Sequence, residues 1–348
     1  MFNLEDKIRP HILGLKPYSS ARDEYTGKEG VFLDANENPF GSAGKHNYNR
    51  YPDPYQHTIK QKIAAIKGIE PSQIFIGNGS DEAIDLLIRL FCAPKKDAII
   101  TMPPTYGMYS VSAEINEVNI IEVPLSEEYE IRDKEVLEAA SETVKLCFVC
   151  SPNNPTGNAL DEKKILHLVE KFEGIVVIDE AYIDFSVQES FTKYLPNYSN
   201  LVVMQTLSKA WGLAGLRLGM AFASPQLIHF INKIKPPYNI SEATQREVLE
   251  NLFLEEQKNE MVTNILRLRE DLKNRLERLP FVKKIYPSDA NFLLVKVSDA
   301  DKMYNNLVNQ QVIVRKRSKV HLCEGCLRIT IGTATENDSF LKAFTTLG

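Results

Sequence analysis

Short, almost wholly apolar runs alternate with amphipathic helical patterns through the middle of this chain. Parallel strands need long crossover connections, which are usually helices, and strands covered by helices on both faces are apolar throughout. The pattern therefore predicts an α/β fold with a mostly parallel seven-stranded sheet between helices. The expected strands are Gln73–Ile76, Ala98–Thr101, Asn119–Val123, Leu146–Cys150, Ile175–Ile178 and Leu201–Met204, with Leu218–Ala223 as the seventh.

The pattern changes after about residue 240, and a smaller α+β domain is expected there. A chain of 348 residues exceeds the size at which a single core stops growing, so two domains are the default. We predict a large domain over 46–265 and a small domain made of 1–45 and 266–348. The first 45 residues are loop-rich and are expected to pack on the C-terminal part. One long helical stretch, 242–278, is followed by expected strands at Phe292–Val297, Val312–Arg315 and Leu327–Ile331.

Composition excludes several classes of protein. The formal net charge of −5 is a poor match for a general nucleic-acid binder, because an excess of Lys and Arg is needed to neutralise phosphates. No run approaches the 18–20 apolar residues of a membrane span, and the first seven residues carry acids where a signal peptide has a basic region. Five cysteines, an odd number, fit reduced thiols. We therefore expect a cytoplasmic protein without nucleic-acid or membrane partners.

Polar, turn-forming segments follow five of the predicted strands. Ligands of open parallel sheets bind beyond the carboxyl ends of the strands, so these segments should converge on one crevice. They are 77–81, 102–107, 151–157, 179–182 and 205–210.

The segment 77–81 is a glycine-containing turn from a strand into a helix. Free N–H groups at a helix start can bind an anion, although Ser80 could instead simply cap the helix. No GxGxxG or GxxxxGK[ST] pattern accompanies the turn, which argues against dinucleotide and P-loop sites.

Three charged residues near strand ends each have a structural and a functional interpretation. Asp179 ends an apolar strand, where a carboxylate is costly unless it is paired or functional. Lys209 is either a solvated charge or an amine nucleophile, and Arg217 is either a structural ion pair or a phosphate clamp. A phosphate site, an imine-forming lysine and a carboxylate for a pyridinium nitrogen together suit pyridoxal phosphate.

The motifs themselves resemble those of the fold-type I pyridoxal-phosphate aminotransferases, and within them the histidinol-phosphate aminotransferase family. The resemblance spans most of the chain, from Leu15 to Gly332. Its most specific segments are Ser151-Pro-Asn-Asn-Pro-Thr-Gly157, Val177-Ile-Asp-Glu-Ala-Tyr182 and Thr206-Leu-Ser-Lys-Ala-Trp-Gly-Leu-Ala-Gly-Leu-Arg-Leu-Gly219. Asp34-Ala-Asn-Glu-Asn-Pro-Phe-Gly41, Asn49-Arg-Tyr-Pro-Asp53 and Gly325-Cys-Leu-Arg328 point to the narrower family.

The resemblance implies a role for each motif residue. Lys209 would be the Schiff-base lysine and the base that moves the proton, and Asp179 would keep the pyridine nitrogen protonated. Tyr182 and Asn154 would bond the phenolate oxygen of the ring, and Tyr106 would stack on it. The cofactor phosphate would be held by Ser80, Asp81, Thr206, Ser208 and Arg217, and by Tyr51 of a partner subunit in a homodimer.

The resemblance also implies the substrates, histidinol phosphate with 2-oxoglutarate on one side and imidazole-acetol phosphate with glutamate on the other. Arg328 matches the arginine that takes the α-carboxylate of amino acids, Arg315 matches an extra arginine of the narrower family, and Tyr18 and Asn154 would also reach the substrate. A phosphate ester is larger and more highly charged than a carboxylate, so a second arginine is physically sensible. Arg315 also lies in a basic run, Arg315-Lys-Arg-Ser-Lys319, and such runs are usually solvated. Glu37 and the loop around Asn36 are weak candidates for gripping the imidazole.

Other interpretations use the same motifs. An aromatic or broad-range aminotransferase, a phospho-amino-acid decarboxylase, and a regulator that keeps the cofactor fold share the cofactor residues. A metal site is not expected, because the first of two CxxC pairs, Cys147 and Cys150, lies in a strand where residues three apart face opposite ways. The second pair is Cys323 and Cys326.

Overall fold

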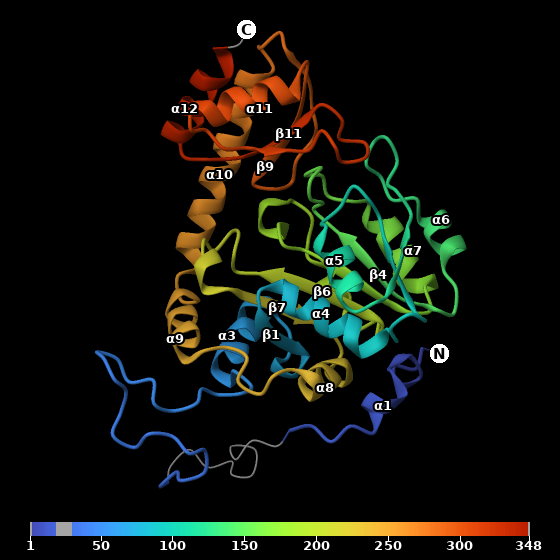
Figure 1. The fold of residues 1–348 in the computed structure, drawn as a ribbon, viewed down its shortest axis with the longest axis vertical. Coiled ribbons are helices and arrows are strands. Elements are labelled where there is room, and N and C mark those ends of the chain that lie inside the picture. The colour runs from blue at the N-terminus through green and yellow to red at the C-terminus, as the bar shows by residue number, and fades with distance from the viewer. Residues whose placement is uncertain (1, 19–29, 347–348) are drawn as a thin grey trace.

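A computed structural model describes residues 2–18 and 30–346. Within these residues, seven strands form one sheet in the order β1-β7-β6-β5-β4-β2-β3 (Figure 1). β7 runs antiparallel to both of its neighbours, and every other pair of neighbours is parallel. The expected fold class is confirmed. The strands are β1 Ile74–Asn78, β2 Ala98–Thr101, β3 Asn119–Glu122, β4 Val144–Cys150, β5 Ile175–Asp179, β6 Leu201–Thr206 and β7 Leu218–Phe222.

Helices cover both faces of this sheet, which explains why its central strands are apolar throughout. In β5, Val176 and Ile178 pack into the core on one face, whereas Ile175 and Val177 pack into the core on the other. The first face is covered by α3 His57–Lys67, α6 Asp133–Ala139, α7 Glu162–Lys171 and α9 Glu242–Asn251. The second face is covered by α1 Pro10–Leu13, α4 Ser80–Phe91, α5 Met108–Ile115 and α8 Pro225–Ile234.

A smaller antiparallel sheet follows, in the order β10-β11-β9-β8. Its strands are β8 Val282–Ile285, β9 Phe292–Val297, β10 Arg315–Lys316 and β11 Cys326–Thr330. It shares one core with α10 Glu255–Leu276, α11 Ala300–Asn309 and α12 Ala334–Thr345. Figure 1 shows α10 running from the side of the large sheet to the small sheet.

Two details of the C-terminal part differ from expectation. The helical stretch 242–278 is two helices, because Leu252 anchors the end of α9 in the core of the large sheet while Leu272 and Leu276 pack under the small one. The expected strand at Val312–Arg315 is reduced to Arg315–Lys316, since Val312 and Val314 pack on the small core outside the ladder.

The N-terminal residues do not pack where the sequence suggested. Leu4, Ile8 and Ile12 are buried against α4 and α8 on the large sheet, and the backbone N–H of Arg9 donates to Leu90 O at 3.1 Å. The expected packing of the first 45 residues on the C-terminal part is therefore wrong for this segment. The division into domains at 46 and 265 stays a prediction, and residue 265 lies inside α10.

Residues 30–50 extend away from the body of the molecule (Figure 1). Val31, Leu33 and Phe40 are 88%, 87% and 97% exposed. The carboxylate of Glu37 ties the first half of this segment to its C-terminal end, accepting hydrogen bonds from Arg50 Nη1 at 2.6 Å and from the Tyr51 N–H at 2.7 Å. We call residues 30–51 the arm.

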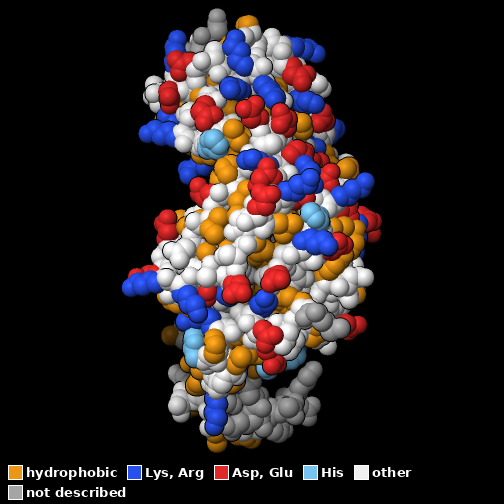
Figure 2. Space-filling model, turned by 90° about the vertical axis from the view of Figure 1, so that its right-hand side faces the viewer, with side chains coloured by type: hydrophobic (Ala, Val, Ile, Leu, Met, Phe, Trp, Pro, Cys, Tyr) orange, Lys and Arg blue, Asp and Glu red, His pale blue; other side chains and the backbone are white. Residues whose placement is uncertain are grey.

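The surface of the body is mixed in charge. In the face shown in Figure 2, Lys and Arg side chains are interspersed with Asp and Glu. Among the described residues, no helix combines the length and the apolar character that crossing a membrane requires.

Candidate active site

A cavity of about 650 Å³ opens at the carboxyl ends of the strands, between the large sheet and the small one. Residues from all five segments that follow strands line it, as expected. The large-sheet side contributes Gly79, Ser80, Asp81, Tyr106, Gly107, Met108, Val111, Cys150, Asn154, Asp179, Ala181, Tyr182, Thr206, Ser208, Lys209, Ala214 and Arg217, and the small-sheet side contributes Arg315, Arg317 and Arg328.

The first turn of α4 opens into this cavity with uncapped N–H groups. Gly79 is the N-cap residue and supplies no side chain, and Ser80 is already the first helical residue. Ser80 therefore does not cap the helix. A helix of this length presents partial positive charge at such an end, so the turn can hold an anion.

Two glycines allow this turn to lie against the β6–β7 connection. A Cβ on Gly219 would meet Gly79 C and Ser80 N at 2.2 Å, and one on Gly79, whose φ is +72°, would meet Arg217 Nη2 at 2.6 Å. The N–H of Gly79 donates to Arg217 O at 2.7 Å. The close packing brings the guanidinium of Arg217 to the uncapped helix end.

Asp81 links Arg217 to Tyr106 at the same end of the cavity. Its Oδ2 lies 3.6 Å from Arg217 Nη2, and its Oδ1 accepts a hydrogen bond from Tyr106 Oη at 3.0 Å. Burial and the charge of Asp81 raise the pKa of the Tyr106 phenol, which is therefore protonated at neutral pH. The side chain of Arg217 is half-exposed at this end of the cavity.

Thr206 and Ser208 complete the polar wall beside Arg217. Thr206 Oγ1 is 2.9 Å from Ser208 Oγ, and it accepts the N–H of Ser208 at 3.1 Å. Thr206 ends β6, and Ser208 immediately precedes Lys209. Two hydroxyls, an arginine and a helix start thus surround one pocket, which matches a phosphate in donor type and charge.

Asp179 lies at the bottom of the cavity, 2% exposed, at the end of β5. Burial raises the pKa of its carboxyl to about 6, opposed by hydrogen bonds from Tyr109 Oη to Oδ2 at 2.7 Å and from the N–H of Ala181 to Oδ1 at 3.1 Å. Within this cavity, a cationic ring nitrogen would satisfy the carboxylate best.

The amine of Lys209 lies above the ring of Tyr182, 5.6 Å from its centroid. Burial lowers the pKa of this amine, and the positive charge of Arg328 lowers it further. A lowered pKa increases the fraction of neutral amine, which is the form that attacks carbonyl carbons and takes up protons.

Tyr182 and Asn154 lie between Lys209 and Arg328. Asn154 Nδ2 is 3.5 Å from Tyr182 Oη, and Asn154 Oδ1 accepts from Arg328 Nη1 at 2.5 Å. The guanidinium of Arg328 stacks on Phe292, with 5.1 Å between Cζ and the ring centroid. Burial raises the pKa of the Tyr182 phenol, while the charges of Arg328 and Arg317 oppose that rise.

Arg315 and Arg328 are cross-strand partners in the β10–β11 ladder and both reach the cavity. The sequence suggested a solvated basic run as the alternative for Arg315. The structure places its side chain at the cavity, together with that of Arg317.

Four of the candidate residues lie outside this cavity, the arm residues Asn36 and Glu37 and the two tyrosines Tyr18 and Tyr51. Tyr18 is 73% exposed. Tyr51 is 52% exposed and stacks on Tyr238, with ring centroids 4.6 Å apart. Within one chain, neither ring is brought to Lys209 or Arg217, and the roles assigned to both stay predictions.

All five cysteines are buried and free. Burial raises the pKa of Cys147 to about 12, so its thiol stays protonated at neutral pH. Among residues 2–18 and 30–346, no group of three His, Cys, Asp or Glu side chains is placed to hold a metal ion.

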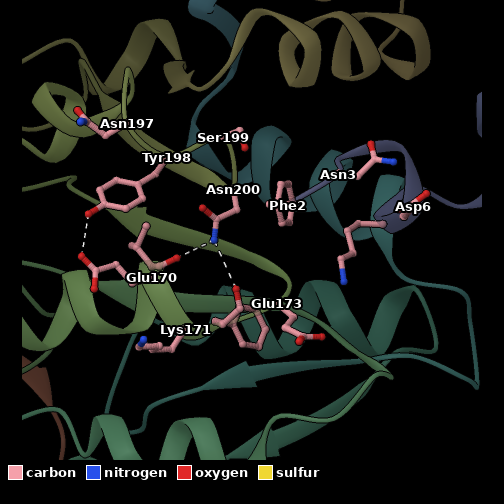
Figure 3. Close-up of a pocket in the computed structure, with 13 residues that line it drawn as sticks. Phe2, Asn3, Asp6, Glu170, Lys171, Glu173, Asn197, Tyr198, Ser199 and Asn200 are labelled. Atoms are coloured by element: carbon pink, nitrogen blue, oxygen red, sulfur yellow. Dashed lines mark hydrogen bonds between the residues drawn. The ribbon is translucent and has the colours of Figure 1, made fainter.

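A second cavity, of about 690 Å³, lies at the opposite ends of the strands (Figure 3). It is lined by the N-terminal segment, the end of α7 and the loop before β6. Two of its polar side chains are paired locally, since Tyr198 Oη donates to Glu170 at 2.9 Å and Asn200 Nδ2 donates to Val169 O at 2.9 Å. Neither Lys209 nor any of the arginines of the first cavity lines it.

Sequence reasoning missed two residues of the site. Tyr109, which donates to Asp179, lies three residues after Tyr106, in α5. No motif marks it, so no feature of the sequence separated it from the other buried residues of this helix. Arg317 was passed over as part of a basic run, although strand alternation from Arg315 places it on the same face.

Comparison with known protein families gives a match over almost the whole chain. The model of the family described as aminotransferase class I and II matches residues 28–344. Histidinol-phosphate aminotransferase from Parabacteroides distasonis is 55% identical over 343 residues, which cover 99% of this chain and 98% of that protein. The protein of the same name from Cytophaga hutchinsonii is 53% identical over 345 residues, 99% of each chain.

Solved structures share the fold at lower identity. Histidinol-phosphate aminotransferase from Sinorhizobium meliloti, in complex with pyridoxal-5′-phosphate, superposes with a TM-score of 0.80 at 21% identity and covers 90% of each chain. L-threonine-O-3-phosphate decarboxylase from Porphyromonas gingivalis superposes with a TM-score of 0.72 at 22% identity, covering 86% of this chain and 91% of that one. The same architecture therefore serves both reactions.

Proposed function

Because the chain belongs to the class I and II aminotransferases, and within them to the histidinol-phosphate aminotransferases, we propose that it uses pyridoxal phosphate to move an amino group between histidinol phosphate and 2-oxoglutarate. The observation that carries the proposal is one cavity that joins an amine of lowered pKa, Lys209, to a buried carboxylate, Asp179, and to the arginines of the small sheet. In the pathway direction glutamate is the donor and histidinol phosphate the product.

The cofactor phosphate fits at the start of α4. The N–H groups after Gly79, the hydroxyls of Thr206 and Ser208, and the guanidinium of Arg217 would hold it, with Ser80 and Asp81 at the helix start. The fit depends on the two glycines, since a Cβ on Gly219 would displace the turn.

The ring of the cofactor would lie between Tyr106 and the end of β5. When bound, pyridoxal phosphate carries the amino group and takes up the electron pair that the substrate carbon releases. Asp179 would hold a proton on the ring nitrogen, and Tyr182 with Asn154 would bond the ring oxygen. Lys209 would bind the cofactor covalently and then carry the proton between the reacting carbons.

The arginines would bind the acidic end of each substrate. Arg328, oriented by Asn154 and Phe292, presents a planar fork that suits a carboxylate or a phosphate. Arg315 lies directly opposite and adds the second positive charge, and Tyr18 would close this end.

We assign the arm to a second copy of the chain, in a homodimer. Three of its apolar side chains, Val31, Leu33 and Phe40, are almost fully exposed in one chain, and Tyr51 lies outside the cavity of its own chain. An exposed apolar segment of this kind normally covers a partner. In the dimer Tyr51 would reach the cofactor phosphate of the partner, so each site would need both chains. The five buried free thiols favour a reducing compartment, the cytoplasm.

The half-reaction can be followed by the absorbance of the bound cofactor. Histidinol phosphate alone should convert the yellow form of the holoenzyme to the pyridoxamine form, and 2-oxoglutarate should restore it. A response to phenylalanine that exceeds the response to histidinol phosphate would instead identify an aromatic aminotransferase. Release of carbon dioxide from a phosphorylated amino acid would identify a decarboxylase.

Replacement of the proposed nucleophile tests the cofactor chemistry. The substitution Lys209→Ala should lower turnover at least roughly a hundredfold, because positioned proton transfer contributes that much or more. Lys283→Ala, at an exposed position of β8, removes the same kind of charge and should leave turnover unchanged. Activity retained in Lys209→Ala would contradict the proposal.

A further inference from the structure

Three arginine side chains share one face of the small sheet. Arg315 pairs with Arg328 across the ladder, and the N–H of Arg317 donates to Cys326 O at 2.9 Å. Because side chains alternate along a strand, Arg315 and Arg317 point the same way, into the cavity. Lys316, between them, points away and forms an ion pair with Asp301 at 2.5 Å.

The three guanidinium groups have no acidic partner in the described part of the chain. Asp81 and Asp179, the carboxylates that line the cavity, are bound to Arg217, Tyr106 and Tyr109 instead. The Nε atoms of Arg317 and Arg328 are buried without a hydrogen-bond acceptor. Burial lowers the pKa of Arg317, and the charges of Arg328 and Arg315 lower it further.

Buried donors without acceptors and clustered like charges both cost free energy, which a bound anion would offset. Three guanidinium groups provide more positive charge and more hydrogen-bond donors than one carboxylate can satisfy. One guanidinium can bind both oxygens of a carboxylate, whereas a phosphate ester has about two negative charges and three acceptor oxygens.

We propose that Arg317 is a third arginine of the substrate-phosphate site and that it determines the preference for a phosphorylated amine over a carboxylate donor. The inference rests on the proposed function. Arg328 and Arg315 would serve both substrates in turn, while Arg317 would engage only the larger, more highly charged group.

The test compares the two half-reactions in holoenzyme variants. Arg317→Gln should lower kcat/KM for histidinol phosphate by about tenfold to a hundredfold, the range of a lost charged hydrogen bond. The loss should appear in KM, with kcat little changed, because the phosphate lies away from the reacting carbon. The glutamate half-reaction should change by less than about threefold. Arg317→Lys, which keeps the charge without the planar fork, should fall between.

Lys319→Gln is the matched control, since it removes one charge from the same basic run at an exposed position outside the cavity. It should leave both half-reactions unchanged. Equal losses with both substrates in Arg317→Gln, or no loss with either, would overturn the inference. If Arg317→Gln does not fold, the same comparison of the two substrates is made with Arg317→Lys.

Inorganic phosphate separates this inference from the proposed function. In the holoenzyme it should inhibit the glutamate half-reaction competitively, and Arg317→Gln should weaken that inhibition by about tenfold or more. This result would support the phosphate site even in a protein that does not turn over histidinol phosphate. Inhibition of equal strength in wild type and Arg317→Gln would exclude Arg317 from the site.

Discussion

The phenol of Tyr109 donates a hydrogen bond of 2.7 Å to Oδ2 of Asp179, and both side chains are buried beneath the cavity. The ring of Tyr109 is clamped between Phe148, stacked at 4.7 Å, and Tyr106, edge-on at 5.5 Å. The carboxylate that would hold the ring nitrogen is therefore oriented by a side chain that itself has little freedom to move.

Tyr109→Phe should move the acid limb of the activity profile to higher pH. The hydrogen bond stabilises the ionised form of Asp179, so its loss raises a pKa that burial has already raised to about 6. Activity that requires the carboxylate is lost as the pH falls through this pKa. The limb of kcat/KM should shift upward by roughly one unit, the equivalent of one charged hydrogen bond.

The control for this variant is Tyr194→Phe. Tyr194 Oη donates to Glu162 at 2.5 Å, far from the cavity, so the same atom is removed from the same kind of contact. Its pH profile should match that of the wild type. An unchanged acid limb in Tyr109→Phe would show that Asp179 does not set this limb.

Gly219→Ala should weaken cofactor binding. Its Cβ would overlap the backbone of Gly79 and Ser80 at 2.2 Å, so the start of α4 must move away from Arg217. Overpacking of this kind costs about 1–3 kcal/mol. The dissociation constant of pyridoxal phosphate, measured by titration of the apoenzyme, should rise about tenfold or more. Gly215→Ala is the matched control, because its Cβ meets nothing within 4 Å.

The large sheet was predictable because burial on both faces leaves an unmistakable apolar pattern. β5 and β6 are wholly apolar until their last residues, and the polar segments after them mark the cavity. The small sheet was harder to predict. β8 has two exposed lysines in four residues, and β10 has only two residues, so neither carries a strong pattern.

Site residues that belong to motifs were predictable, and those defined by packing were not. Lys209, Asp179 and Arg217 lie at or near strand ends in recognisable segments, and all line the cavity. The role of Tyr109 follows only from the packing of α5 against β5, which brings its phenol to Asp179, 70 positions further along the chain. The arm is a different case, since in the proposed homodimer its place would depend on a second chain.

Glu180→Gln should change how stability depends on pH. Burial raises the pKa of the Glu180 carboxyl to about 7, although Ser190 Oγ, the N–H of Phe191 and Gln205 Nε2 donate to it. The folded protein therefore holds a proton that the unfolded chain releases near pH 4.5. Wild-type stability should fall relative to the variant as the pH rises from 5 to 8, by up to about 3 kcal/mol. Melting temperatures of the two proteins across this range measure the difference. A constant difference would show that Glu180 is ionised throughout.

Mixing two inactive variants tests whether Tyr51 acts on the partner. A dimer of one Lys209→Ala chain and one Tyr51→Ala chain would contain one site with both defects and one intact site, provided that Tyr51 crosses to the partner. Denaturation and refolding of an equal mixture should then give about a quarter of the wild-type activity, since half of the dimers are mixed and each mixed dimer has one intact site. If Tyr51 instead serves its own chain, every site keeps one defect and the mixture stays as inactive as its parents. Refolded wild type is the control for yield.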